Sequence, residues 1–140
     1  CIPARGSADA LAVAMLRQVL ERDGAAVEVS STAELSGETL ELLRTRRVDV
    51  VCVSAMPPSQ FLHVRYLCKR IAAQFPGLPI IAGMWTLELD AKWLADPLVN
   101  LPGLQVVSSL RDARLQVRQA ADATYGRRQA ALAARAVSPA

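Results

Sequence analysis

The chain has 140 residues, which is enough for one domain with a single hydrophobic core. Hydrophobic residues make up 52% of it and charged residues 21%, a balance typical of globular proteins and not of disordered ones. The 16 basic and 13 acidic residues leave a net charge of +3, whereas nucleic-acid-binding domains usually carry a larger, clustered basic excess. We therefore expect no nucleic-acid partner. No apolar run reaches the ~18 residues that a membrane span needs.

The first elements are a strand, a helix and a second strand. The chain begins at Cys1, inside what the pattern indicates is a strand over residues 1–3, so we expect it to be part of a longer protein. Residues 7–23 carry a broad apolar stripe at helical spacing, and Gly24 follows as a typical residue just past a helix end. Residues 26–29 read as a short second strand.

The middle of the chain is the most informative part. A helix starts near Ser36, and a third strand over residues 48–54 is continuously apolar and rich in β-branched residues. That composition is typical of a parallel strand that is covered on both faces. The helix over residues 60–75 ends at a Pro-Gly pair, and a fourth strand follows over residues 78–83.

The last third predicts a short helix near residues 90–95, a fifth strand over residues 104–107 and a long helix from Leu110 that is rich in Ala and Arg. We expect this helix to be interrupted or to end near Gly126, because glycine is a poor helix former. We therefore predict a domain over residues 1–125 and a basic, Ala- and Arg-rich tail over residues 126–140. The tail can contact acidic lipid, but docked helices with a basic outer side are more common.

Alternating strands and helices predict an α/β fold, a three-layer sandwich with helices on both faces of a parallel sheet. Five strands suit the flavodoxin-like order 2-1-3-4-5. In such sheets ligands bind outside the carboxyl ends of the strands, where the order reverses. The loops that follow the first, third and fourth strands are therefore the predicted binding region.

Several side chains fall in or beside these loops. Arg5 and Ser7 precede or begin a helix, where free N–H groups and a guanidinium can hold an anion. Ser54 and Ser59 can bind a polar ligand, and we expect His63 and Trp85 at the rim. Each has a plain structural alternative: helix capping for the serines Ser7 and Ser59, a surface position for the histidine, and packing for the tryptophan.

Known catalytic patterns are absent from the sequence. The loop after the first strand lacks the acidic residues of a phosphorelay receiver, the glycines of a dinucleotide fingerprint, and the Cys-to-Arg spacing of a small phosphatase. His63 has no obvious acidic partner for a serine hydrolase. Cys1, Cys52 and Cys68 have no zinc-ligand spacing, and we interpret the last two as small core hydrophobes.

The arrangement resembles the cobalamin-binding-like family over about the first 120 residues. Members that bind cobalamin base-off carry D-x-H-x-x-G after the first strand, where the sequence here is Ser7-Ala8-Asp9-Ala10-Leu11-Ala12. Asp9 stands where the cobalt-ligating His would be. The later motifs S-x-L and G-G fall on Ser54-Ala55-Met56 and Ala82-Gly83. Because the axial His is absent, we expect no cobalamin and no other cofactor.

A closer resemblance is to the soluble C-terminal domain of proteobacterial permeases of the autoinducer-2 exporter family. It is carried by Ser54-Ala55-Met56-Pro57-Pro58, by Arg65-Tyr66-Leu67-Cys68-Lys69-Arg70, and by the stretch from Phe75 to Trp85. The resemblance implies a domain on the cytoplasmic side of the bacterial inner membrane, attached to the membrane part of the same polypeptide.

Together these patterns predict a non-catalytic regulatory or small-molecule-sensing domain of a membrane permease. Its ligand would be small and polar or anionic, and the predicted contacts are Arg5, Ser7, Asp9, Ser54, Ser59, His63 and Trp85. Two alternatives stay open: an enzyme or cobalamin carrier that uses the same crevice, and a protein-interaction module that forms homo-oligomers and binds nothing small.

Overall fold

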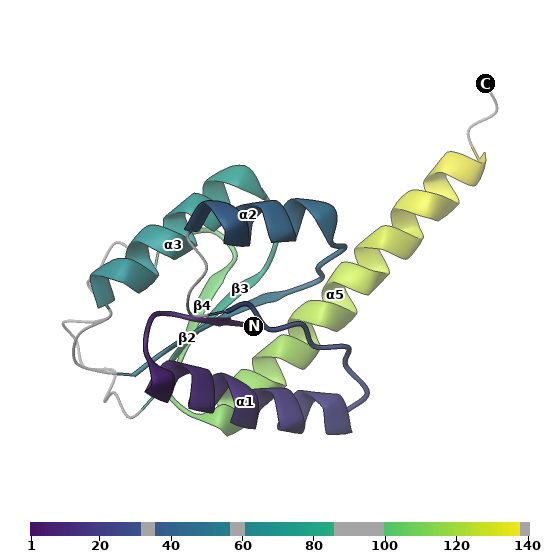
Figure 1. Ribbon diagram of the computed structural model, residues 1–140. Coiled ribbons are helices and arrows are strands. Elements are labelled where there is room, and N and C mark those ends of the chain that lie inside the picture. The colour runs from purple at the N-terminus through teal and green to yellow at the C-terminus, as the bar shows by residue number, and fades with distance from the viewer. Residues whose placement is uncertain (32–35, 57–60, 86–99, 138–140) are drawn as a thin grey trace.

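The computed structural model describes residues 1–31, 36–56, 61–85 and 100–137. These residues form an α/β fold that combines a parallel sheet with helices (Figure 1). In chain order the elements are β1 (Ile2–Pro3), α1 (Ser7–Arg22), α2 (Ser36–Thr45), β2 (Val51–Ala55), α3 (Phe61–Gln74), β3 (Ile80–Met84), β4 (Leu104–Val107) and α5 (Leu110–Val137).

The sheet is parallel throughout, and its order is β1-β2-β3-β4. Val53 of β2 lies opposite Ile2 on one side and Ala82 on the other, and Ala82 in turn lies opposite Val106. Every residue of β2 and β3 is buried. The continuous apolar runs therefore predicted these two central strands correctly, since both of their faces are covered.

The predicted second strand over residues 26–29 is not a strand among the residues that the structure describes. The segment lies beside the start of β1, where the Cys1 amino group donates to the Glu28 carbonyl at 2.6 Å and the Ser30 N–H donates to the Cys1 carbonyl at 3.0 Å. Strand β1 is only two residues long, so it offers too short an edge for a regular ladder. The prediction of five strands in the order 2-1-3-4-5 is corrected to four in the order given above.

Helices cover both faces of the sheet, which confirms the three layers. Because side chains alternate along a strand, Val51 and Val53 join one apolar cluster with α2 and α3, whereas Cys52 joins a second cluster with α1 and α5. Figure 1 shows α2 and α3 above the sheet, with α1 and the beginning of α5 below it. The loop that follows β1 leads into α1 at the carboxyl edge of the sheet, and β2 ends at the same edge.

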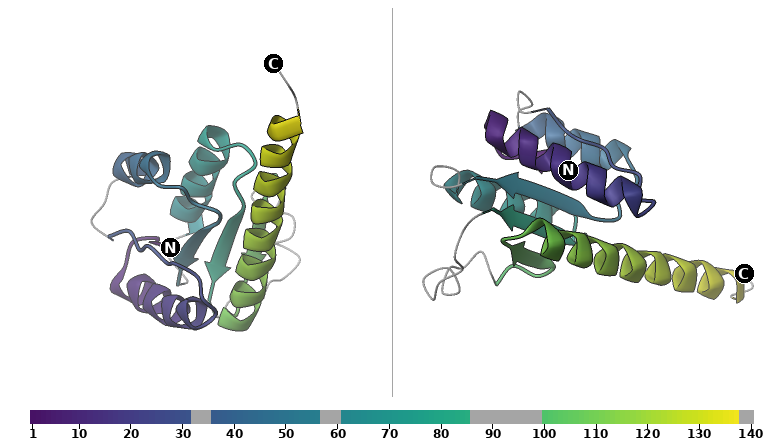
Figure 2. Two further views of the ribbon diagram at one scale, coloured as in Figure 1. Left: turned by 90° about the vertical axis from the view of Figure 1, so that its right-hand side faces the viewer. Right: turned by 90° about the horizontal axis from the view of Figure 1, so that it is seen from below.

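The last helix differs from its prediction. Helix α5 continues through Gly126 without a break to Val137, because the alanines and arginines around the glycine are strong helix formers that offset its cost. Thr124 is buried, and residues 125–135 are all exposed. Figure 2 shows this part of α5 projecting away from the sheet. The helix predicted near residues 90–95 lies outside the described residues.

Candidate functional site

A buried carboxylate joins the two loops at the carboxyl ends of β1 and β2. Asp9, the third residue of α1, is only 2% exposed. Its Oδ2 accepts the backbone N–H groups of Arg5 at 2.9 Å and Gly6 at 2.8 Å, and its Oδ1 accepts the N–H of Met56 at 2.6 Å. Both oxygens of Asp9 are therefore occupied, and the negative charge sits in the first turn of a helix, where the helix dipole favours it.

A second set of hydrogen bonds extends this network to β3. The Ser54 hydroxyl, 1% exposed, donates to the backbone carbonyl of Asp9 at 3.3 Å and accepts the indole N–H of Trp85 at 2.7 Å. The Trp85 backbone N–H donates to the Ala55 carbonyl at 3.2 Å. The ends of β1, β2 and β3 are thus connected through buried polar atoms that all have partners.

Glycine at position 83 makes room for the Trp85 ring. A Cβ added to Gly83 would lie 2.2 Å from Cζ2 of Trp85, a distance that no packed side chain tolerates. The ring therefore folds back across the strand that precedes it, and it packs with Cys52 and Ile81 in the cluster formed by α1 and α5. This position explains why the indole N–H reaches Ser54.

The structure divides the predicted site residues into two groups. Asp9, Ser54 and Trp85 are buried together in the network. Arg5 and Ser7 are exposed at the start of α1, and His63 is half-buried at the start of α3. Ser59 lies outside the described residues.

The cap of α1 also differs from its prediction. Gly6, and not Ser7, is the N-cap residue, and Asp9 supplies the side-chain acceptor for its N–H. The Ser7 hydroxyl is consequently not required for capping.

The buried thiols are confirmed as core residues. Cys52 and Cys68 are unpaired and almost fully buried. Burial raises the pKa of Cys52 to about 11 and that of Cys68 to about 12. Both thiols are thus protonated at neutral pH, whereas a nucleophilic cysteine needs a lowered pKa.

The described part of the chain lacks a cluster of metal-ligating side chains and a helix able to cross a membrane. Residues 1–31, 36–56, 61–85 and 100–137 contain no group of three or more His, Cys, Asp or Glu side chains that could hold a metal ion. In the same ranges, no helix is both long enough and apolar enough to cross a membrane.

Sequence reasoning missed the bridging role of Asp9. An acidic residue three positions after Gly6 is the spacing of a capping box, and this signal could have predicted the local half of the network. The bond to Met56 spans 47 residues, and only the packing of α1 on β2 brings the two together.

Comparison with family models, with curated proteins and with solved structures found no match to this chain. The resemblances stated from the sequence therefore stay predictions.

Proposed function

We propose that this domain is a non-catalytic sensing module of a bacterial membrane permease, and that it binds a small polar or anionic molecule at the carboxyl ends of its strands. The observation that carries the proposal is the Asp9 carboxylate, which holds the loop after β1 and the loop after β2 at the same time. A ligand that moves one of these loops therefore also disturbs the hydrogen bonds between the Asp9 carboxylate and the other loop.

Coupling of this kind is what a sensing site needs. A ligand shifts a conformational equilibrium only by as much as its affinity differs between the two states. Here the Met56 N–H and the Arg5 N–H share one carboxylate, so a ligand held by the first loop alters the energy of the second. The change would pass to the membrane part of the same polypeptide on the cytoplasmic side.

The ligand contacts in this proposal are the polar groups that remain at the surface of this edge. The exposed Arg5 side chain supplies a positive charge beside the N-terminus of α1, and the exposed Ser7 hydroxyl lies in the first turn. His63, which is half-buried in the first turn of α3, is the third group in this proposal. Asp9, Ser54 and Trp85 then act as the scaffold beneath the ligand.

Cobalamin is not part of the proposal. The position of the cobalt-ligating His is taken by Asp9, whose oxygens already accept three backbone N–H groups. A carboxylate that is bound in this way is a poor ligand for cobalt. Turning it toward a metal would leave three N–H donors without a partner, at a cost of ~1–3 kcal/mol each.

A protein-interaction module is the second candidate, and the projecting half of α5 favours it. Tyr125 and Leu132 are 64% and 60% exposed and lie seven residues apart, which places both on the same side of the helix. In this alternative the domain forms a homo-oligomer through α5 and binds nothing small.

A ligand screen by thermal shift separates these possibilities. We expect small anions among the compounds that stabilise the wild-type chain, and we expect Arg5→Ala to weaken them about tenfold or more, since a charged hydrogen bond contributes ~1.5–3 kcal/mol. Arg111→Ala, which removes an exposed arginine at the start of α5, is the matched control. An anionic hit that Arg5→Ala and His63→Ala both leave unchanged would place the site elsewhere. A screen without any hit would favour the interaction module.

A further inference from the structure

An open groove of about 580 Å³ lies at the amino-terminal end of the strands, opposite the carboxyl edge. It is formed by the end of α2 with the loop before β2, by the loop between α3 and β3, and by the second half of α5. Its volume is within the range of small-molecule sites. The network residues Asp9, Ser54 and Trp85 do not line it, so the groove is separate from the proposed sensing site.

The groove is rich in arginine, and no Asp or Glu of the described chain lines it. Five of its 14 lining residues are arginines, namely Arg44, Arg46, Arg47, Arg127 and Arg128. The dipole of α2 explains Arg44, which lies in the last turn of that helix, because a helix C-terminus favours cations. It does not explain the two arginines in α5. A groove with this lining attracts anions.

Three of the five arginines are paired with acidic side chains, and two are not. The ion pairs are Arg44–Glu41 at 3.8 Å, Arg46–Glu28 at 3.6 Å and Arg128–Asp49. Arg47 and Arg127 form no ion pair within the part of the chain that the structure describes. The groove therefore holds two guanidinium groups whose positive charge no carboxylate balances.

Hydrogen bonds bring the two arginines of α5 to the loop before β2. The Arg128 guanidinium donates to the Val48 carbonyl at 3.4 Å as well as to the Asp49 carboxylate. The Thr124 hydroxyl donates to the Asp49 carbonyl at 3.4 Å and accepts an N–H of Arg127 at 3.0 Å. Both guanidinium groups are thus held beside residues 48 and 49.

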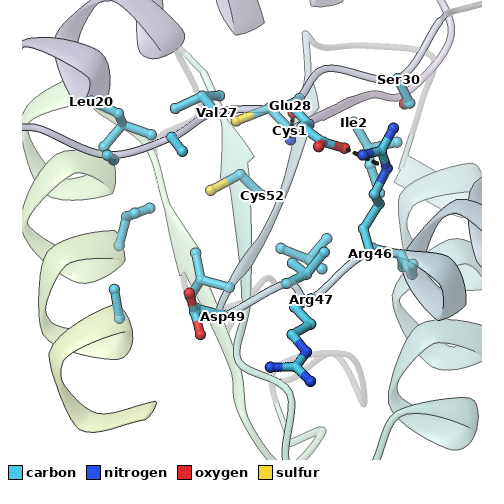
Figure 3. Close-up of a pocket in the computed structure, with 18 of the residues that line it drawn as sticks. Cys1, Ile2, Leu20, Val27, Glu28, Ser30, Arg46, Arg47, Asp49 and Cys52 are labelled. Carbon is cyan, nitrogen blue, oxygen red and sulfur yellow. Dashed lines mark hydrogen bonds and ion pairs between the residues drawn. The ribbon is translucent and has the colours of Figure 1, made fainter. Parts of the chain in front are cut away.

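The side chain of Arg47 is available to a ligand at the same place. It is exposed, and it makes no hydrogen bond or ion pair in the described part of the chain. Figure 3 looks into a neighbouring cavity that Arg47 also lines, and it shows the Arg47 guanidinium on the side of Asp49 and away from the Arg46–Glu28 pair. Because the arginines of α5 bond to Asp49, they and Arg47 surround the same residue.

A phosphate group is the anion that suits these donors best. The planar guanidinium presents paired N–H donors that match two oxygens of a phosphate, so arginine can bind it through two parallel hydrogen bonds. A phosphate monoester carries about two negative charges at neutral pH. Two unpaired guanidinium groups balance that charge, whereas a carboxylate would balance only one of them.

We propose that this groove binds a phosphate group, and that Arg47 and Arg127 hold it. Arg127 keeps its bond to Thr124 through one nitrogen and offers its other N–H groups to the phosphate. Arg47 turns toward the phosphate without breaking a bond. The group belongs to a small molecule or to a lipid headgroup, and the site is independent of the one at the carboxyl edge.

The test is a titration of the isotope-labelled 140-residue chain with diphosphate at low salt, followed by amide chemical shifts. We expect saturable binding, with the largest shifts at Val48, Gly77 and Arg127, and much weaker binding of acetate. Arg47→Gln and Arg127→Gln should each weaken diphosphate about fivefold, the worth of one charged hydrogen bond at an exposed site. Arg111→Gln, which removes an exposed arginine at the other end of the sheet, should not change it.

A second experiment distinguishes the two sources of the phosphate group. The chain is sedimented with phosphatidylcholine vesicles that contain or lack phosphatidic acid. A chain that sediments only with phosphatidic acid, and is released in the double variant Arg47→Gln/Arg127→Gln, takes the group from a lipid. A chain that binds diphosphate but not these vesicles takes it from a soluble molecule.

Arg47→Gln separates binding from folding. Its melting temperature should equal that of the wild type, because the Arg47 side chain has no partner to lose. The proposal is overturned if neither diphosphate at millimolar concentration nor phosphatidic acid binds, if the double variant binds as well as the wild type, or if acetate binds as tightly as diphosphate. Shifts confined to Gly6 and Ser7 would place the phosphate at the carboxyl edge and would overturn it as well.

Discussion

Asp9 is the residue on which the carboxyl end of the sheet depends. Its carboxylate is the common acceptor for three backbone N–H groups from two loops, and its own carbonyl accepts the Ser54 hydroxyl. No other side chain type of this size offers two charged acceptor oxygens. The sequence placed Asp9 in the binding region through the family resemblance, but its contact with Met56 depends on tertiary packing, which no local pattern reports.

Asp9→Asn should therefore destabilise the domain. Asparagine keeps one acceptor oxygen and turns an NH2 group toward a backbone N–H, so at least one buried donor loses its partner. We expect the free energy of unfolding to fall by ~2–4 kcal/mol, measured by urea denaturation. Asp112→Asn is the matched control, because Asp112 occupies the same position in the first turn of α5 and bonds only the neighbouring Ser109. Equal and small losses in both variants would contradict the bridging role.

Gly83→Ala should also destabilise, because its Cβ would collide with the Trp85 ring. We expect a loss of ~1–3 kcal/mol, the usual cost of overpacking, together with a changed tryptophan fluorescence. Gly126→Ala serves as the control of opposite sign. A Cβ at Gly126 meets nothing within 4 Å, and alanine there should stabilise α5 by ~0.5–1 kcal/mol. A fluorescence spectrum unchanged by Gly83→Ala would mean that Trp85 does not fold back over β3.

At the scale of elements, hydrophobic periodicity predicted those helices and strands whose positions depend on burial. Continuous apolar runs gave β2 and β3, and the Pro-Gly pair gave the end of α3, because both patterns follow from burial and backbone geometry. Residues 26–29 do not form a strand, contrary to the prediction. A strand needs a neighbouring strand of similar length to pair with, and β1 is only two residues long. Gly126 does not end α5, contrary to the prediction. The unfavourable helix propensity of one glycine is small compared with the favourable propensities of the alanines and arginines around it.

The projecting half of α5 should add little to the stability of the domain. Residues 129–135 are exposed, and the Arg128–Asp49 ion pair that anchors this half precedes them. We expect a chain that ends at Arg128 to unfold within about 1 kcal/mol of the complete chain, since removal of exposed residues rarely changes more. The measurement is urea denaturation at two protein concentrations. A larger loss that depends on concentration would show that this half of α5 is buried in an oligomer.

At the scale of the whole molecule, the two apolar clusters on either side of the sheet each bury one thiol. The pKa of Cys52 and that of Cys68 are raised from 9.0 to about 11 and about 12. Their contribution to stability is therefore fully present below pH 9 and is lost as the pH rises from 9 toward 11. By linkage we expect a loss of ~1.4 kcal/mol per pH unit for each thiol in this window.

Urea denaturation between pH 8 and pH 10.5 checks this expectation. The double variant Cys52→Ala/Cys68→Ala has lost both groups, so its stability should fall less steeply over the same range. Parallel slopes for the two proteins would mean that the thiols are not desolvated, and the clusters would then be more open than the structure shows.

The central claim is that the coupled loops at the carboxyl edge hold a small polar or anionic molecule. A native mass spectrum of the freshly purified domain tests it most directly, because it reports bound ligand and oligomeric state together. We expect a population heavier than the 140-residue chain by one small molecule, and we expect Arg5→Ala to lose it while Arg111→Ala keeps it. A wild-type spectrum that contains only ligand-free chain, as dimers, would contradict the claim and support the interaction module.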